Sequence, residues 1–217
     1  MKLKNIKPIL SLTVASALTI GGFAAPFSST AAEATSNTIK VQLLGMNDLH
    51  GQIDKKLMLD LDKDGEKETI FGGMDYAATY LKEREASNPN TLIVHSGDMV
   101  GGSPLVSSYF QDEPTIEIME AIGFDVGTVG NHEFDEGIAE MLRLVNGGTH
   151  PEGKGTEGFD GTNFPMVAAN VYDKSTGKRL LEPYAIKEVG GVKIGFIGVA
   201  TQETPDMIVS KGNENLQ

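Results

Sequence analysis

The 217-residue sequence contains no cysteine and no tryptophan, and only 18 of its side chains are basic against 30 that are acidic. The absence of cysteine excludes a small fold held together by disulfide bonds. The formal net charge of −12 argues against the basic surface that nucleic acid or an anionic membrane attracts. With 40% hydrophobic residues, the chain can bury a sizeable core, which excludes intrinsic disorder and collagen.

The first 34 residues form a segment of their own. Lysines near the start precede an uncharged, mostly apolar stretch, and residues 32–34 read Ala-Glu-Ala, the form of a cleavage site. This pattern predicts a secretory signal peptide over residues 1–34 and therefore a secreted or cell-surface protein. A membrane-spanning helix is the alternative, but prolines and glycines interrupt the stretch before it reaches the ~20 apolar residues that a span needs. We expect no stable membrane span in the mature chain.

From residue 35 onward, predicted strands and helices alternate. Amphipathic helical spacing predicts helices over residues 74–85, around Ile118 between Pro114 and Gly123, and from Ile138 to the Gly147-Gly148 pair. Short apolar runs predict strands at residues 39–44, 91–94, 124–129, 166–171, 184–189 and 192–199. Such alternation predicts an α/β fold with helices on the faces of a sheet, and ligands at the carboxyl ends of its strands.

Polar residues follow three of the predicted strands. Asp48 and His50 follow the first, Asp98 follows the second, and Asn131 with His132 follows the third. Carboxylates and imidazoles suit a borderline divalent ion such as Mn, Fe, Zn or Co, and a carboxylate such as Asp98 can bridge two ions. Each cluster alone could be an ordinary turn or a helix cap. The occurrence of three such clusters at the ends of successive strands, each next to a glycine, is not easily explained by the ordinary composition of loops.

Three longer strings around these residues resemble a known family. They are Gly-Met-Asn-Asp-Leu-His-Gly (45–51), Gly-Asp-Met-Val-Gly-Gly-Ser-Pro (97–104) and Val-Gly-Asn-His-Glu-Phe-Asp-Glu-Gly (129–137). They resemble the calcineurin-like metallophosphoesterase superfamily, and within it the exported bacterial 5′-nucleotidases and 2′,3′-cyclic-nucleotide phosphodiesterases. The resemblance runs from about Val41 to the end. It implies a layered α/β fold with helices packed on central β-sheets.

The resemblance also implies an activity and a cofactor. It predicts hydrolysis of nucleotide phosphoesters by a water molecule that two divalent metal ions (Mn, Zn, Co or Fe) activate. Two such ions can hold a phosphate between them and lower the pKa of the attacking water. The expected partner is a small nucleotide and not a nucleic-acid polymer. The oligomeric state is not predicted.

Individual residues take roles from the same resemblance. Asp48 and His50 would ligate the first metal, Asp98 would bridge both metals, and Asn131 would ligate the second. Asn131 and His132 would bind the substrate. His132 would act catalytically on the leaving group, with Asp135, three residues further along the chain, orienting its imidazole.

The family pattern is incomplete in this sequence. The family uses a further isolated histidine and a Gly-His-x-His pair, whereas this chain has only His50, His95, His132 and His150. We therefore expect residues 35–217 to be the N-terminal part of a longer, here truncated, catalytic domain that is poorly active alone. A metal-binding surface protein without turnover is the alternative. His95, just before the Gly-Asp motif, is interpreted as a structural residue.

One acidic segment resembles the start of a calcium loop. Asp60, Asp62 and Asp64 alternate before Gly65, as in an EF-hand, but the twelfth position is Phe71 where a bidentate glutamate is required. A solvated acidic loop is therefore favoured over a calcium site.

Overall fold

A group of parallel strands organises the part of the chain that the computed structural model describes, residues 38–67, 69–209 and 211–217. The predicted signal peptide lies outside these residues. The parallel strands are β1 (Gln42–Met46), β4 (Thr91–His95), β5 (Gly127–Thr128) and β6 (Met166–Val167). Strand β1 pairs with β4 and β5 pairs with β6, while a parallel bridge between Val94 and Val126 joins the two pairs.

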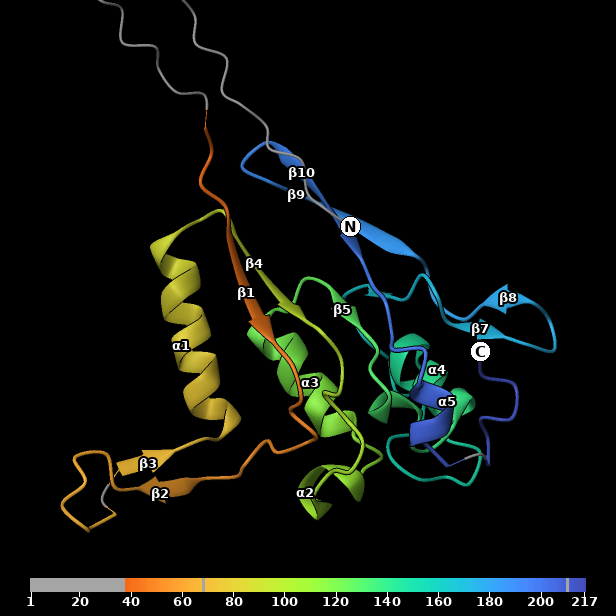
Figure 1. Ribbon diagram of the computed structural model, residues 1–217, viewed down its shortest axis with the longest axis horizontal. Helices are drawn as coiled ribbons and strands as arrows, with labels where there is room; N and C mark the ends of the chain where they lie inside the picture. The colour runs from red at the N-terminus through yellow and green to blue at the C-terminus, as the bar shows by residue number, and fades with distance from the viewer. Residues whose placement is uncertain (1–37, 68, 210) are drawn as a thin grey trace, which may run out of the picture. The chain divides into compact units, whose positions relative to one another are not determined.

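Helices connect these strands, as the alternating pattern predicts. They are α1 (Met74–Ser87), α2 (Leu105–Ser108), α3 (Glu113–Ile122) and α4 (Ile138–Asn146). Helix α1 contacts β4 and α3, and Figure 1 shows it running alongside β1 and β4. The 3₁₀ turn η1 (His132–Phe134) lies between β5 and α4 and contacts α4.

Three antiparallel hairpins and a short helix complete the described chain. The hairpins pair β2 (Leu57–Leu59) with β3 (Thr69–Phe71), β7 (Tyr172–Asp173) with β8 (Lys178–Arg179), and β9 (Tyr184–Val189) with β10 (Val192–Ile197). Helix α5 (Thr204–Met207) follows β10. In sequence, the β2–β3 hairpin connects β1 to α1, as Figure 1 shows.

The hydrophobic core gathers around the parallel strands. Its most buried side chains come from the central strand and from the helices, among them Ile93, Met119, Phe134 and Met141, each no more than 1% exposed. Burying one such side chain contributes roughly 1.5–3 kcal/mol to folding. The core therefore fixes the positions of β1, β4 and β5, the strands that Asp48, Asp98 and His132 follow.

The α/β class is confirmed, and the helices match the prediction more closely than the strands do. Helix α1 begins at Met74 as predicted, and α3 ends at Gly123, whose φ of 89° reverses the chain. Strand β1 starts three residues later than predicted, because its first pairing partner is Thr91 at the beginning of β4. Strands β5 and β6 are each only two residues long, shorter than their apolar runs suggest.

A buried ionic cluster joins α3, α4 and the loop that follows α4. Arg143 donates to Glu113 Oε1 over 2.7 Å, and to both carboxylate oxygens of Glu140 over 2.8 and 2.7 Å. Glu113 Oε2 also accepts from the main-chain N–H of Thr156 over 2.8 Å. The three charged side chains are at most 9% exposed. Their mutual ion pairs therefore have to offset the cost of removing each charge from water.

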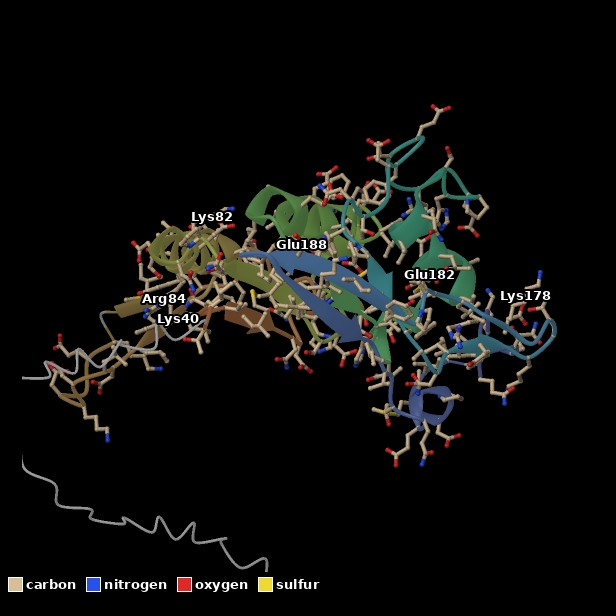
Figure 2. The ribbon with its side chains drawn as sticks, turned by 90° about the horizontal axis from the view of Figure 1, so that it is seen from above. Lys40, Lys82, Arg84, Lys178, Glu182 and Glu188 are labelled. Carbon is tan, nitrogen blue, oxygen red and sulfur yellow. The ribbon has the colours of Figure 1, made fainter. Side chains whose placement is uncertain are left out.

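Other charged residues lie at the periphery of the described chain. Lys82, Arg84 and Lys178 are exposed, and Figure 2 shows them at the outside of the ribbon. Within the described ranges, no helix has both the length and the apolar character that crossing a bilayer requires.

Candidate metal centre

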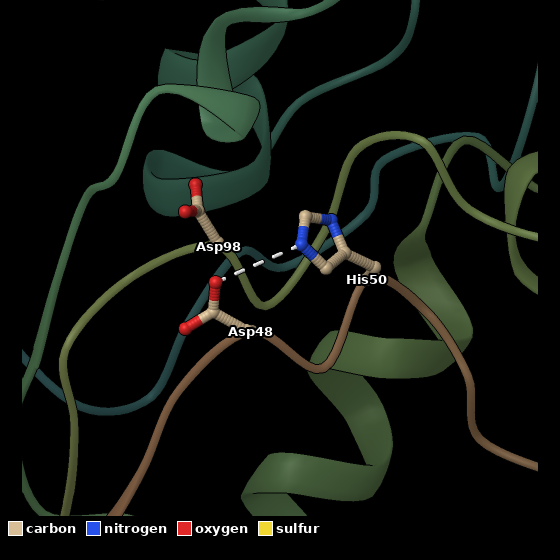
Figure 3. A group of neighbouring side chains, drawn as sticks. All are labelled: Asp48, His50 and Asp98. Atoms are coloured by element: carbon tan, nitrogen blue, oxygen red, sulfur yellow. Dashed lines mark ion pairs between the residues drawn. The ribbon is translucent and has the colours of Figure 1, made fainter.

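Asp48, His50 and Asp98 come together beyond the ends of β1 and β4. The two strands are parallel and Met46 lies opposite His95, so the turns that follow them start side by side. Each of the three side chains offers a ligand atom, and these atoms all lie within 4.8 Å of one another. Figure 3 shows Asp48 and His50 on one loop and Asp98 on the other, with 3.9 Å between His50 Nε2 and Asp48 Oδ1.

The same three residues have an unusual backbone conformation. Asp48, His50 and Asp98 have φ angles of 54°, 49° and 54°, in the left-handed region that residues other than glycine seldom adopt. Main-chain hydrogen bonds between the two turns hold this arrangement, from Asp48 N to Gly97 O over 3.2 Å and from His50 N to Asp98 O over 3.0 Å. Strained backbone of this kind clusters at functional sites, where the surrounding structure enforces it.

A hydrogen bond to the main chain sets the tautomer of His50. Its Nδ1 lies 3.0 Å from the carbonyl oxygen of Gly101, which can only accept. Nδ1 therefore carries the proton, and the lone pair of Nε2 is left on the side of the ring that faces Asp48. Metal-binding histidines commonly have this arrangement, because the second hydrogen bond fixes the orientation of the ring.

Asp98 is tied to the segment that follows β5. Its Oδ1 accepts the main-chain N–H of His132 over 2.9 Å. Gly130 passes so close that a Cβ atom at this position would overlap Asp98 Oδ1. Any larger residue at position 130 would therefore force the Asp98 carboxylate to shift from this position.

His132 and Asp135 form the pair that the family resemblance implies. His132 Nδ1 lies 2.9 Å from Asp135 Oδ2, so Nδ1 carries a proton and Nε2 is the ring nitrogen that can meet a ligand. Burial alone lowers the pKa of His132, but the hydrogen bond to Asp135 and the charges of Asp135, Asp98 and Glu133 outweigh it and raise the pKa above 6.5. The rings of His132 and His50 meet edge to face, with 4.5 Å between their centroids.

Asn131 lies at the start of the same turn. It directly precedes η1, its side chain belongs to a residue only 8% exposed, and its carbonyl accepts the N–H of Phe134 over 3.1 Å. Metal ligation by its side chain stays a prediction.

Glu133, to which the sequence assigned no role, lies in the same turn as His132. Its carboxylate accepts three main-chain N–H groups, from Asp98 over 2.9 Å, Met99 over 2.8 Å and Gly130 over 2.6 Å. Burial raises the pKa of Glu133 to about 6, although these hydrogen bonds oppose the rise. The only sequence signal was its place between His132 and Asp135 in the family string.

The donor set fits a divalent cation. Two carboxylates and an imidazole whose Nε2 carries a lone pair are oxygen and nitrogen ligands that borderline ions such as Mn²⁺ and Zn²⁺ accept. The hydrogen bond from His50 Nδ1 to Gly101 O and the bond from His132 N to Asp98 Oδ1 hold two of these donors in place.

Two other groups from the sequence analysis lie apart from this centre. His95 is 4% exposed and its Nδ1 accepts the N–H of Gly97 over 3.3 Å, which confirms its structural interpretation. In the acidic loop, carboxylate oxygens of Asp60, Asp62 and Asp64 lie within 4.8 Å of one another, and Asp62 and Asp64 are exposed. Calcium binding there is not expected, in keeping with Phe71 at the twelfth position.

The profile of the calcineurin-like phosphoesterases matches residues 41–195, which contain every residue of the candidate centre. The chain belongs to the calcineurin-like phosphoesterase family. The resemblance that the three strings carried is thereby confirmed. Members of this family use divalent metal ions, and the Asp48, His50 and Asp98 group offers candidate ligands for one.

Similar proteins extend the comparison. The chain is 58% identical to Endonuclease YhcR of Bacillus subtilis, over 82% of its own length and 14% of that protein. It is 40% identical to Cell wall protein Lmo0130 of Listeria monocytogenes, over 95% of this chain and 27% of that one. The solved 5′-nucleotidase precursor of Thermus thermophilus superposes with a TM-score of 0.59 at 30% identity, over 76% of this chain and 29% of the other. This calcineurin-like phosphoesterase chain thus spans less than a third of each of these proteins.

Proposed function

We propose that this chain contributes the metal-binding and leaving-group residues of an exported hydrolase of nucleotide phosphoesters, acting as a 5′-nucleotidase, a 2′,3′-cyclic-nucleotide phosphodiesterase or both. The observation that carries the proposal is the meeting of Asp48, His50 and Asp98 within 4.8 Å, with Asp98 hydrogen-bonded to His132. The similarity to a 5′-nucleotidase precursor supports the substrate class.

Two divalent ions (Mn, Zn, Co or Fe) complete the proposed site. Asp48 and His50 would hold the first, Asn131 the second, and Asp98 both. When bound, such ions polarise the phosphate and lower the pKa of the attacking water. Asp98 can serve both ions because only one lone pair of Oδ1 is used by the N–H of His132.

The protein itself supplies the group for the leaving oxygen. His132 presents Nε2, because Asp135 engages Nδ1. A protonated His132 can donate to the departing ribose oxygen, and a positioned acid of this kind contributes roughly 10²–10⁴-fold to the rate. Asp135 keeps the ring in the required tautomer, and the bond from His132 N to Asp98 holds the same residue beside the ligands.

Charge explains why cations are needed before the substrate binds. The chain carries a formal net charge of −12, and Asp48, Asp98 and Asp135 all lie at the centre. A phosphoester is an anion, so an unneutralised centre would repel it. Cation uptake by the aspartates therefore turns the site from one that repels phosphate into one that binds it.

Export is part of the proposal. The basic start, apolar stretch and Ala-Glu-Ala sequence at residues 32–34 predict a cleaved signal peptide. The 40% identity to a cell wall protein supports a location outside the cytoplasm.

A second candidate is cleavage of nucleic-acid strands. The 58% identity to a protein named an endonuclease supports this candidate. Both reactions hydrolyse a phosphoester and would use the same ligands. The net charge of −12 favours the small nucleotide. A nucleic-acid strand needs basic side chains that bind its phosphates, and Asp48, His50 and Asp98 supply no lysine or arginine.

The test compares substrates and metals in the full-length protein that contains this chain. Phosphate release from AMP and from 2′,3′-cyclic AMP, and cleavage of a labelled oligonucleotide, are measured with Mn²⁺, with Zn²⁺ and after exhaustive chelation. We expect metal-dependent release from the mononucleotides, abolished in Asp98→Asn and retained in Asp62→Asn, the matched change in the acidic loop. Turnover that survives chelation contradicts the mechanism. Cleavage of the oligonucleotide alone selects the second candidate, and metal binding without turnover selects a binding protein.

A further inference from the structure

Glu133 lies between the turn after β4 and the turn after β5, with its carboxylate buried. The residue is 7% exposed. Its Oε1 accepts the N–H of Met99, while its Oε2 accepts the N–H groups of Asp98 and Gly130. One carboxylate therefore connects the turn that carries Asp98 with the turn that leads into Asn131.

All three of these hydrogen bonds run to the main chain. They act on where the two turns lie and not on the rotamer of any one side chain. Hydrogen bonds to a carboxylate are roughly twice as strong as those between neutral groups, and three of them converge here. Because the bonds share the same two oxygen atoms, moving one turn relative to the other would lengthen at least one of them.

The conformation of Asp98 shows why such support matters. Its φ of 54° is unfavourable for a residue with a side chain, so the surrounding structure has to enforce it. The N–H of Asp98 goes to Glu133, its carbonyl accepts from His50, and its Oδ1 accepts from His132. The constraints from His132 and Glu133 both come from the segment after β5, and Glu133 also fixes the N–H of Gly130 in that segment.

Burying a carboxylate is costly, and Glu133 has no basic partner among its described hydrogen bonds. Glu113, which is 2% exposed, pairs with Arg143. A residue that served packing alone could be apolar at this place. The hydrogen bonds of Glu133 are instead directed at the two turns that hold the candidate ligands.

We propose that Glu133 is a positioning residue that keeps Asp98 in register with the segment from Asn131 to His132, without itself touching metal or substrate. The inference rests on the proposed function and deepens it, since correct register is what lets Asp98 serve two ions. Residues that orient metal ligands typically cost 10–100-fold in metal affinity or activity when they are changed.

The informative variant is Glu133→Gln in the full-length protein. Glutamine keeps the size of the side chain, but its NH₂ group must then face main-chain N–H donors. Glu113→Gln is the matched control, because it also neutralises a buried glutamate but lies among different partners. Mn²⁺ affinity and stoichiometry are measured by calorimetry, magnetic coupling between Mn²⁺ ions by electron paramagnetic resonance, kcat and KM by phosphate release, and Tm by calorimetric unfolding.

We expect Glu133→Gln to lower Mn²⁺ affinity by roughly 10–100-fold, to lose the coupled Mn²⁺ signal, and to lower kcat more than it raises KM. Glu113→Gln should lower Tm yet keep the coupled signal. If Glu133→Gln does not fold, Glu133→Asp replaces it, since aspartate keeps both acceptor oxygens on a shorter side chain. A weakened coupled signal in Glu133→Asp is then the expected result.

The outcomes separate the inference from the function on which it rests. A coupled signal and Mn²⁺ affinity that match the wild type in Glu133→Gln, or in Glu133→Asp, overturn the role of Glu133 alone. A coupled signal lost equally in Glu113→Gln also overturns it, because the effect is then one of general stability. A wild-type protein that shows no coupled signal overturns the two-ion function, and with it the role of Glu133.

Discussion

The main-chain N–H of His132 donates to Asp98 Oδ1 over 2.9 Å. This bond joins the residue proposed to meet the leaving group to the residue proposed to hold both metal ions. The bond uses the main chain of His132, so it fixes the Asp98 carboxylate relative to the turn and leaves the His132 imidazole free for another partner. The predictions below use this bond, and the buried groups around it, to separate effects on the site from effects on stability.

The first prediction concerns the close approach of the two turns. In Gly130→Ala the added methyl group overlaps Asp98 Oδ1, so the Asp98 carboxylate has to shift from its present position. We expect Mn²⁺ affinity to fall roughly 10–100-fold by calorimetry. Gly45→Ala is the control, since a Cβ at Gly45 in β1 meets no atom within 4 Å. Equal Mn²⁺ affinity in the two variants would show that the turns tolerate separation.

The second prediction concerns the protonation of His132 in the metal-free protein. Asp135 raises the pKa of His132 through its hydrogen bond and its charge. Asp135→Asn removes that charge, so the imidazole should lose its proton at lower pH than in the wild type. The chain has four histidines, which makes NMR titration of the imidazole signals tractable. A His132 pKa that stays unchanged in Asp135→Asn would rule out the assigned pairing.

The third prediction concerns acid stability. Burial lowers the pKa of His95 from 6.5 to about 4, so the folded protein resists a proton that the unfolded chain takes up below pH 6.5. The contribution of His95 is therefore fully present above pH 6.5 and is lost as pH falls toward 4. The gap between the two values is worth about 3 kcal/mol of unfolding free energy.

A comparison with His95→Gln isolates this effect. Glutamine can still accept the N–H of Gly97 but does not titrate. The variant should be less stable at pH 7, because it loses the packing of the ring against Phe124 and Phe164. Its free energy of unfolding, measured with urea, should fall less steeply than that of the wild type between pH 6.5 and 4. Parallel curves would mean that another group governs acid unfolding.

The fourth prediction concerns the buried ionic cluster. Arg143→Met leaves Glu113 and Glu140 buried without their cation, which should lower the free energy of unfolding by about 3–5 kcal/mol. Lys82→Ala breaks an ion pair with Glu85 whose side chains are 49% and 41% exposed, and should cost less than about 1 kcal/mol. Urea unfolding at pH 7 measures both. Similar losses would show that the cluster is not a stabilising unit.

Local patterns determined the helices and predicted the candidate site residues. Helices α1 and α4 follow from apolar residues at helical spacing, and glycines on both sides of α4 mark its ends, which are properties of neighbouring residues. Asp48, Asp98 and His132 were predicted at the site because each follows a short apolar run and lies in a family string. The lengths of β5 and β6 were wrong because a strand ends where its pairing partner ends, and that partner is distant in the sequence.

The sequence by itself determined the family, the α/β class and the donor atoms that can meet a metal ion. Only the tertiary structure decided how these donors are held. Glu133 binds main-chain N–H groups, which nearly every residue possesses, so no residue type marks its partners in the sequence. The register of β1 against β4 brings Asp48 and His50 to Asp98, although about 50 residues separate them along the chain. The sequence itself shows which side chains can bind a metal ion. Hydrogen bonds between distant turns form only after the core has placed the strands side by side.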